Sequence, residues 1–233
     1  MMSPMLSKED RQLNLIEDIR TCKGCSLCNI RNGNPVVGAG PLRADIVVIG
    51  EAPGEQEEKE GYPFVRRAPA GEVLTNVIMD ALGFGREHLF LTNVVLCRPV
   101  SQDKYKKNDT PIESYMNACA VHLREQLEII DPKVIIAMGA TASSSLTGIS
   151  LRASQYRQKL FWYGYWPIIC TWHPSYIARQ GKRGSGGKGC PAYNEMVSDI
   201  RLAWNLRCSD SVAAKVPFKD GIQIVFDNLT LNA

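Results

Sequence analysis

The chain has 233 residues, of which 45% are hydrophobic and 22% are charged. This composition is ordinary for a globular protein and argues against a mostly disordered chain. The length suits one large domain or two small ones. No run approaches the ~18 apolar residues that a membrane-spanning helix needs. The formal net charge of +3 permits a polyanionic partner without requiring one.

The first residues, MMSPMLSKEDRQ, lack the apolar core of a cleaved secretory signal. We therefore expect a cytoplasmic protein in a reducing environment. The chain contains eight cysteines, whereas a secreted disulfide scaffold would be shorter and denser in cysteine. In a reducing compartment, a CxxC pair usually serves metal or redox chemistry.

The hydrophobic pattern predicts alternating helices and strands along the chain. Helices are expected at residues 7–20, 71–82, 110–130, 140–146 and 192–206. Strands are expected at residues 45–50, 88–97, 133–139 and 166–172, with a further one at GIQIVF in the tail. Long loops rich in Gly, Pro or basic residues are expected at residues 51–71, 98–109 and 173–189.

This alternation predicts an α/β fold with a largely parallel sheet. In such sheets, binding sites form beyond the carboxyl ends of the strands. Polar or small residues stand at those ends, namely Glu51, Ala52, Asn93, Gly139 and His173. If the strands are neighbours, these residues meet in one crevice.

The cysteines offer a second site. Cys22 and Cys25 form a CxxC pair, Cys97 ends an expected strand, and Cys119 lies on an expected helix. Four thiolates suit tetrahedral zinc or an iron–sulfur cluster. Two other interpretations stay open from spacing alone. In the first, Cys97 and Cys119 are ordinary core cysteines that bind no metal. In the second, Cys28 joins Cys22 and Cys25 in a ferredoxin-like triplet.

Five segments occur in a fixed order along the chain, namely GEAPGEQEEKEGYPFV, TNVVLCRP, the helix carrying Cys119, KVIIAMG and WHPS. This ordered set resembles the family 4 uracil-DNA glycosylases. The resemblance runs from about Thr21 to about Trp204. It implies a three-layer α/β/α sandwich around a short, mainly parallel sheet. Residues 1–208 would form that single domain, and residues 209–233 a C-terminal extension with one added strand.

The resemblance implies a DNA repair enzyme that flips uracil out of DNA and hydrolyses its N-glycosidic bond, leaving an abasic site. Its partner would be uracil-containing single- or double-stranded DNA, bound by a monomer. A protein partner such as a sliding clamp is not readable from the sequence. The family carries a structural 4Fe-4S cluster, which implies that Cys22, Cys25, Cys97 and Cys119 are its ligands here.

The resemblance also assigns roles around the base. Phe64 is the platform on which uracil stacks, and Asn93 reads O4 and N3–H through its amide. His173 donates to O2 of the departing uracil. From the residues alone, Phe64 also fits a core aromatic and Asn93 a polar residue satisfied within its strand.

The nucleophilic water has a less direct assignment. The best-studied glycosylases place an aspartate after the first strand, where this chain has Ala52. Glu51 is then the nearest group for holding the water, and catalysis would rest on stabilising the leaving group. Glu57 is expected as a pocket wall that crowds the methyl group of thymine.

The segment from His173 to Arg179 is expected to begin a loop that enters the minor groove, with Tyr176 or Ile177 as its wedge. The residues expected to contact DNA are Ser175, Tyr176, Ile177, Arg179, Lys182 and Arg183, with Lys188 following. The interpretation of the basic residues as a solvated loop stays open.

The sequence departs from the family at several places that border the pocket. Arg66 stands where a glycine is usual, and the segment before the next helix is about two residues longer. These departures indicate a divergent branch and leave two alternatives. One is a glycosylase for another modified base, and the other is a catalytically silent iron–sulfur protein that binds nucleic acid.

Overall fold

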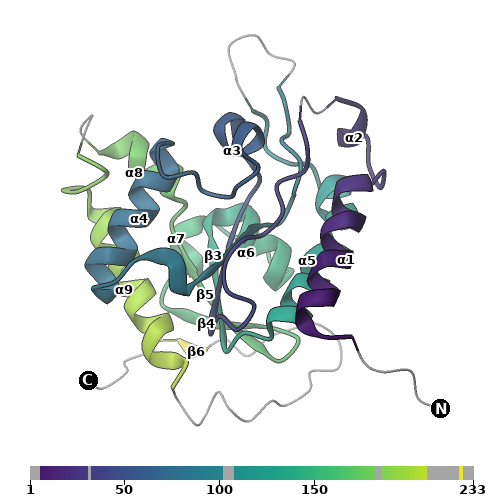
Figure 1. Ribbon diagram of the computed structural model, residues 1–233. Helices are drawn as coiled ribbons and strands as arrows, with labels where there is room; N and C mark the ends of the chain where they lie inside the picture. Colours follow the sequence, from purple (N-terminus) through teal and green to yellow (C-terminus); the bar gives the residue numbers. More distant parts are fainter. Residues whose placement is uncertain (1–5, 31–32, 102–107, 182–184, 209–225, 228–233) are drawn as a thin grey trace.

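The computed structural model describes residues 6–30, 33–101, 108–181, 185–208 and 226–227 (Figure 1). The first half contains α1 (Lys8–Thr21), α2 (Leu27–Ile30), β1 (Ile46–Gly50), α3 (Glu55–Glu60), α4 (Pro69–Leu82), a 3₁₀ turn (Arg86–His88) and β2 (Phe90–Asn93). The second half contains α5 (Glu113–Ile130), β3 (Val134–Met138), α6 (Gly139–Thr147), α7 (Ala153–Tyr156), β4 (Lys159–Tyr163), β5 (Trp166–Thr171), α8 (Pro174–Gln180), α9 (Pro191–Leu206) and β6 (Phe226–Asp227).

One sheet forms the centre, with strand order β2-β1-β3-β5-β4-β6. The strands β2, β1, β3 and β5 are parallel, and β4 runs antiparallel to β5. Every residue of β1, β3 and β5 is buried. This explains why these strands appear in the sequence as nearly continuous apolar runs, because a strand covered on both faces has no polar side.

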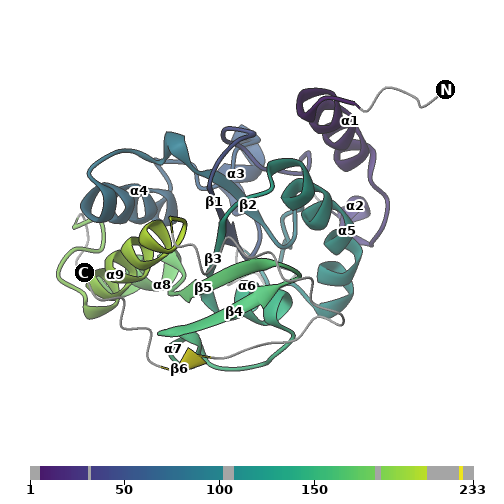
Figure 2. The same ribbon diagram turned by 90° about the horizontal axis from the view of Figure 1, so that it is seen from below.

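Helices cover both faces of the sheet, which confirms the three-layer α/β/α architecture (Figure 2). Alternate residues of a strand point to opposite faces. Val48 and Ile136 therefore pack in the apolar cluster formed with α4, α8 and α9. Their neighbours Val47 and Ile135 pack in the cluster formed with α5 and α6. Helix α1 lies outside this sandwich and packs on α5 (Figure 1).

Two helices occupy segments that the sequence predicts as loops. Helix α3 lies between Gly54 and Gly61, and the Glu57 side chain accepts the Gly54 N–H at 2.9 Å. Helix α8 begins at Pro174, directly after His173, whose ring caps it. Both helices are short and polar, so neither shows the apolar stripe by which a longer helix is recognised. The helix expected from residue 110 begins three residues later, since α5 starts at Glu113 after Ile112.

Strand β4 is absent from the sequence prediction. It pairs with β5 through a two-residue turn, Gly164–Tyr165, in which Gly164 has a φ of +60°. Glycine accepts this left-handed conformation without strain, as tight hairpin turns require. The expected strand in the tail corresponds to β6, which pairs with β4 through Phe226 and Asp227. The other residues of GIQIVF lie outside the described part of the chain.

No helix of the described segments has the length and apolar character that crossing a bilayer requires.

A buried ion pair fastens α9 to the end of β5. The Asp199 carboxylate accepts from Arg157 Nε at 2.8 Å and Nη2 at 3.1 Å, and from Thr171 Oγ1 at 2.6 Å. Next to Thr171, the Trp172 indole donates to Glu195 of α9 at 2.5 Å. These contacts hold the two residues that precede His173, so they position the start of α8.

We expect Asp199→Ala to lower the free energy of unfolding by about 1.5–3 kcal/mol, because it removes the buried carboxylate partner of Arg157 and leaves this cation only the more exposed Glu195, at 2.9 Å. Urea denaturation measures this change. The matched control is Glu128→Ala, which removes an exposed partner of Arg124. Solvent and salt screen that surface pair, so stability should barely change. Equal effects of the two variants would contradict the structural role of Asp199.

Candidate active site and cysteine cluster

A cavity of about 1020 Å³ opens beyond the carboxyl ends of the parallel strands. The segment that follows β1 forms one side, from Glu51 to Glu57. His173 and the exposed side of α8 contribute another wall, and Phe64 lies between them. This position is the one expected for a ligand site in an open α/β sheet.

Gly50 allows two side chains to converge at the end of β1. In the parallel register, Gly50 lies opposite Asn93 of β2. A Cβ atom on Gly50 would stand 2.5 Å from Asn93 Oδ1 and 2.5 Å from Phe64 Cζ. Such distances are impossible for a real side chain, so any residue larger than glycine would displace the amide and the ring. Asn93 and Phe64 are 3% exposed.

The backbone of Phe64 adopts a left-handed conformation with a φ of +52°. This region is unfavourable for a bulky residue, so surrounding contacts must hold it. Arg86 donates from Nη1 to the Phe64 carbonyl. Gly71 of α4 approaches the same carbonyl, because a Cβ on Gly71 would lie 2.6 Å from that oxygen. The platform predicted from the sequence is therefore braced from behind.

His173 caps α8 and is a neutral hydrogen-bond donor. Its Nδ1 accepts the Ser175 N–H at 3.1 Å. A neutral imidazole that accepts at Nδ1 carries its proton on Nε2. Desolvation, together with the positive charge of Arg179, lowers the pKa of His173 to about 4. Gly139, with a φ of +84°, lets α6 approach, since a Cβ there would stand 2.9 Å from His173 Cβ.

The rings of Phe64 and His173 are 6.4 Å apart between centroids and tilted by 44°. The structure thus brings Asn93, Phe64 and His173 to one end of the sheet from three separate segments. A flat heterocycle that enters this space would meet a ring, an amide and an imidazole N–H.

Two carboxylates have defined partners at the cavity. Glu51 Oε2 accepts from Thr141 Oγ1 of α6 at 2.6 Å. Glu57 is buried, and burial raises the pKa of its carboxyl group. Glu57 lines the cavity as predicted, and so does Ala52, which offers no polar side-chain atom.

The segment predicted to contact DNA divides into exposed and buried residues. Ser175 and Arg179 line the cavity. Tyr176 is half-buried and stacks on Trp172 with ring centroids 4.9 Å apart. Ile177 is fully buried in the core, so it does not fit the predicted role of a wedge. Lys182 and Arg183 lie outside the described residues. Lys188, the following basic residue, pairs with Asp80 at 2.9 Å.

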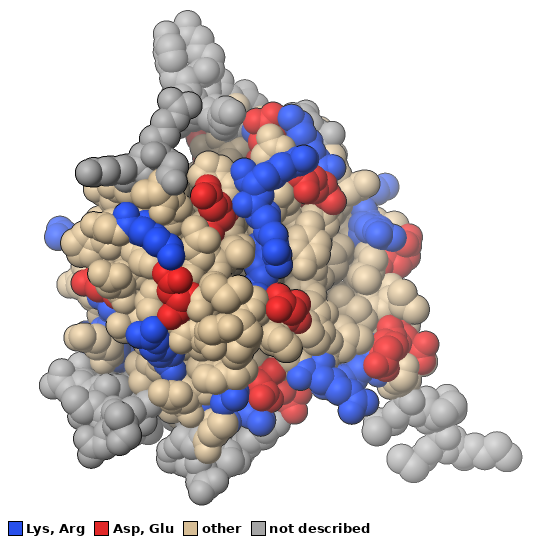
Figure 3. Space-filling view, turned by 60° about the vertical axis from the view of Figure 1, so that its left-hand side comes forward, with Lys and Arg blue, Asp and Glu red and all other residues tan. Residues whose placement is uncertain are grey.

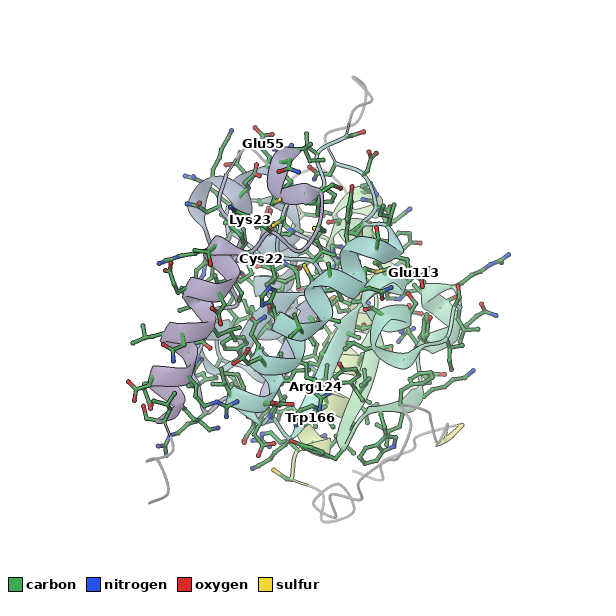
Figure 4. All side chains as sticks on the ribbon, turned by 90° about the vertical axis from the view of Figure 1, so that its right-hand side faces the viewer. Cys22, Lys23, Glu55, Glu113, Arg124 and Trp166 are labelled. Carbon is green, nitrogen blue, oxygen red and sulfur yellow. The ribbon has the colours of Figure 1, made fainter. Side chains whose placement is uncertain are left out.

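The four predicted cysteine ligands gather where α1 ends beside α5. Figure 4 shows Cys22 at this end of α1. Cys25 packs on the apolar cluster that contains Cys97 and Cys119. Burial, together with the neighbouring thiols Cys97, Cys25 and Cys22, raises the pKa of the Cys119 thiol to about 12. These three sulfurs are therefore close enough to Cys119 to act on its thiol.

The CKGC turn is shaped to lie against α5. A Cβ on Gly24 would stand 3.9 Å from Ala118 Cβ, next to Cys119, and the Gly24 N–H donates to Cys22 Sγ at 3.4 Å. Among the residues that the structure describes, no three His, Cys, Asp or Glu side chains are arranged to hold a metal ion. An iron–sulfur cluster is wider than a single ion and takes thiolates that stand farther apart. An all-sulfur donor set of this kind fits such a cluster.

Comparison with known proteins decides the family. Residues 37–201 match the model of the uracil DNA glycosylase superfamily. The chain belongs to this superfamily. The match begins before β1 and ends within α9, so it contains the whole parallel sheet and the cavity. The resemblance stated from the sequence is confirmed at the level of the superfamily.

The relatives of this superfamily member confirm the narrower resemblance. A type-4 uracil-DNA glycosylase of Thermotoga maritima is 39% identical over 177 residues, which cover 75% of this chain and 87% of the relative. One of Pyrobaculum aerophilum is 33% identical over 176 residues, covering 71% and 84%. One of Sulfurisphaera tokodaii is 44% identical over 123 residues, covering 53% and 52%.

Sequence reasoning missed two residues that support the site. Thr141 holds Glu51, and Arg86 holds the carbonyl of Phe64. Neither stands in a motif of metal-ligating, nucleophilic or acid–base type. A polar residue two positions after Gly139, the first residue of α6, was a usable signal for Thr141, because that position lies in the first turn of a helix at the carboxyl edge of the sheet.

We expect His173 to stay neutral from pH 8 down to about pH 4, because its folded pKa of about 4 lies below the 6.5 of a free histidine. The unfolded chain takes up this proton first, so stability should fall as pH decreases from about 6.5 to about 4. NMR titration of the ring protons of the three histidines measures the pKa. His173→Asn identifies the resonance, and a pKa near 6.5 would contradict the desolvated neutral donor.

Proposed function

We propose that this chain excises uracil from DNA by hydrolysing the N-glycosidic bond, which leaves an abasic site. The observation that carries the proposal is a cavity lined by Phe64 and the neutral His173, with the Asn93 amide next to the Phe64 ring at the end of β2. Membership in the superfamily and similarity to proteins named type-4 uracil-DNA glycosylases support it. The substrate is a flipped nucleotide, since a base that is stacked inside a duplex cannot enter the cavity.

Recognition of uracil rests on Asn93 and Phe64. The Asn93 amide has a donor for O4 and an acceptor for N3–H. Cytosine presents the opposite pattern at these two positions, so both contacts would become donor-to-donor and acceptor-to-acceptor. The Phe64 ring supplies the stacking surface. Glu57, fixed by its bond to the Gly54 N–H at 2.9 Å, is the wall that would crowd the methyl group of thymine.

Bond cleavage rests on the leaving group. As the bond breaks, negative charge develops on O2 of uracil, and His173 Nε2–H donates to it. The donor is set in advance, because the Ser175 N–H fixes the tautomer. Glu51 holds the attacking water with one carboxylate oxygen while Thr141 fixes the other. This arrangement takes the place of the aspartate that the best-studied glycosylases have at the position of Ala52.

The DNA partner is single- or double-stranded and approaches the open side of the cavity. Ser175 and Arg179 contact the strand at the cavity rim, and Tyr176 is the remaining candidate for a wedge. Lys182 and Arg183 are proposed to extend this track. The complete set of base-binding groups belongs to one chain, which suits a monomer. We place the enzyme inside the cell, where its DNA substrate is.

The cofactor of this proposal is a structural 4Fe-4S cluster held by Cys22, Cys25, Cys97 and Cys119. When bound, it supplies four cross-links among the CKGC turn, the segment after β2, and α5. Cys97 is followed by Arg98 and Pro99, and Pro99 lines the cavity. Residues 1–208 are proposed as one catalytic domain, and residues 209–233 as an extension of it.

Oligonucleotides that carry uracil, hypoxanthine, xanthine or 5-hydroxymethyluracil test the proposed activity. After incubation and alkali treatment, we expect strand cleavage at uracil. Cleavage at only one of the other bases would show that this base, and not uracil, is the substrate. No cleavage at any base would indicate a catalytically silent protein that binds nucleic acid.

Asn93→Asp provides the sharper form of this test, because it removes the donor to O4. Uracil excision should fall steeply, by roughly 10–10²-fold, since the buried O4 loses its donor at ~1–3 kcal/mol and faces a carboxylate instead. A trace of cytosine excision is expected, because the carboxylate accepts from the cytosine amine. A folded variant that excises uracil at the wild-type rate would remove Asn93 from base recognition.

Anaerobically purified protein should contain about four irons per chain. Cys97→Ser and Cys119→Ser should lose that iron, because each removes one thiolate of the set. Iron analysis, with absorbance of the brown cluster, provides the measurement.

Matched controls for this experiment are other cysteines of the chain. Cys170→Ser changes a buried thiol that is not among those acting on Cys119. Cys28→Ser changes a thiol that bonds to its neighbour Asn29 at 3.4 Å. Both variants should keep their iron. Iron loss in Cys28→Ser alone, or stoichiometric zinc after iron-replete expression, would overturn the assignment.

A further inference from the structure

Arg86 is a buried cation with no carboxylate partner in the described part of the chain. Its residue is 6% exposed. One guanidinium nitrogen, Nη1, donates to the Phe64 carbonyl. The adjacent carboxylate Glu87 acts on Arg86 through its charge, but its ion pair is with Arg66, at 3.9 Å. A buried arginine without an ion pair of its own is costly, so an anion placed next to this guanidinium would be stabilising.

The guanidinium of Arg86 lines a second cavity, of about 310 Å³. The other lining residues are Glu60, Tyr62, Val65, Arg66 and Arg67. Arg67 also lines the large cavity, so the two cavities are neighbours. Tyr62 is 41% exposed, and the Arg86 guanidinium lies 5.8 Å from the centre of its ring. Three arginines therefore surround a small space beside the base site.

The existing pairs of the two outer arginines are easily exchanged. Arg67 contacts Glu60 at 2.5 Å with 70% of its side chain exposed, and Arg66 is 64% exposed. Exposed ion pairs contribute little to stability, since water competes with them. Both guanidinium groups can thus turn to another anion. The face in Figure 3 shows elongated basic side chains near its centre, with acidic ones interspersed.

We propose that this second cavity binds a phosphate of the DNA strand, next to the nucleotide whose base enters the large cavity. The inference rests on the proposed function. Arg86 would bind the phosphate through N–H groups that do not contact Phe64, and Arg66 and Arg67 would close over it. Arginine suits phosphate because its planar fork donates two parallel hydrogen bonds.

This site would couple backbone binding to base binding. Arg86 contacts the carbonyl of Phe64, whose strained backbone presents the ring to the base. A phosphate on Arg86 would supply the missing counter-charge and hold the guanidinium in the orientation that braces Phe64. The chain-specific element is Arg66, which stands where a glycine is usual in the family.

The test combines protein variants with neutralised DNA. Single strands carry an uncleavable abasic analogue, and one methylphosphonate linkage replaces each nearby phosphate in turn. Dissociation constants are measured for the wild type and for Arg66→Gln/Arg67→Gln. We expect one linkage to weaken wild-type binding about tenfold and the variant less than twofold. The slope of the logarithm of the binding constant against the logarithm of salt concentration should also be smaller for the variant. The difference should correspond to the loss of about one to two phosphate contacts.

Arg124→Gln is the matched control. Arg124 is an exposed arginine that pairs with a glutamate, Glu128 at 2.9 Å, and lies on α5 in the opposite helix layer. Its variant should keep the wild-type pattern at every linkage. Equal penalties at all linkages for the wild type and the double variant would overturn the phosphate site, and so would an unchanged salt slope.

Arg86→Met tests the central residue after its fold is verified by thermal unfolding. It should remove the same position-specific penalty. If millimolar inorganic phosphate abolishes the loss of wild-type affinity at the methylphosphonate linkage, the site takes the phosphate group itself. If free phosphate leaves this loss of affinity intact, the result supports binding through the DNA backbone. A position-specific penalty in a protein that excises no uracil would support this site and refute the proposed function. Uracil excision without the penalty would refute only this site.

Discussion

The absence of a side chain at Gly50 is the constraint on which the base site depends. β1 and β2 run parallel with Gly50 opposite Asn93, and the Phe64 ring occupies the space beside them. A single added carbon would collide with the amide oxygen and the ring. The strand end therefore leaves the space in which the Asn93 amide and the Phe64 ring lie together. Any larger residue there would displace one of them.

The opposite wall of the cavity is organised by the start of a helix. Nδ1 of His173 accepts a hydrogen bond from the Ser175 N–H, which satisfies a backbone donor of α8 and fixes the proton on Nε2. Desolvation then keeps the ring uncharged. A neutral donor of this kind costs no proton uptake when charge develops on a substrate. The Asp199 network lies directly behind, where it holds Thr171 at the end of β5.

Several supports link distant parts of the molecule to the same cavity. Arg86 reaches from the turn before β2 to the carbonyl of Phe64. Arg98 follows Cys97 and contacts the buried Glu58 at 3.3 Å, one residue from the cavity wall Glu57. The segment that follows Cys97 thus braces α3 and joins the four cysteines to the wall of the cavity.

The sequence by itself determined the parallel strands, the long helices, and the residues at the strand ends. A continuous apolar run such as IVVIG is stable as a strand that is covered on both faces of the sheet. Asn93 and His173 stand out in the sequence because polar residues at the ends of buried strands require hydrogen-bond partners. The resemblance of five ordered motifs added the family and the four cysteines. Short polar helices such as α3 and α8 escaped prediction, because they carry no apolar stripe. The tautomer of His173, the Thr141 bond to Glu51 and the Arg86 bond to the Phe64 carbonyl were decided only by the tertiary structure. Each joins residues far apart in the chain, and the desolvation that gives them their chemistry exists only once the sheet and both helix layers have packed.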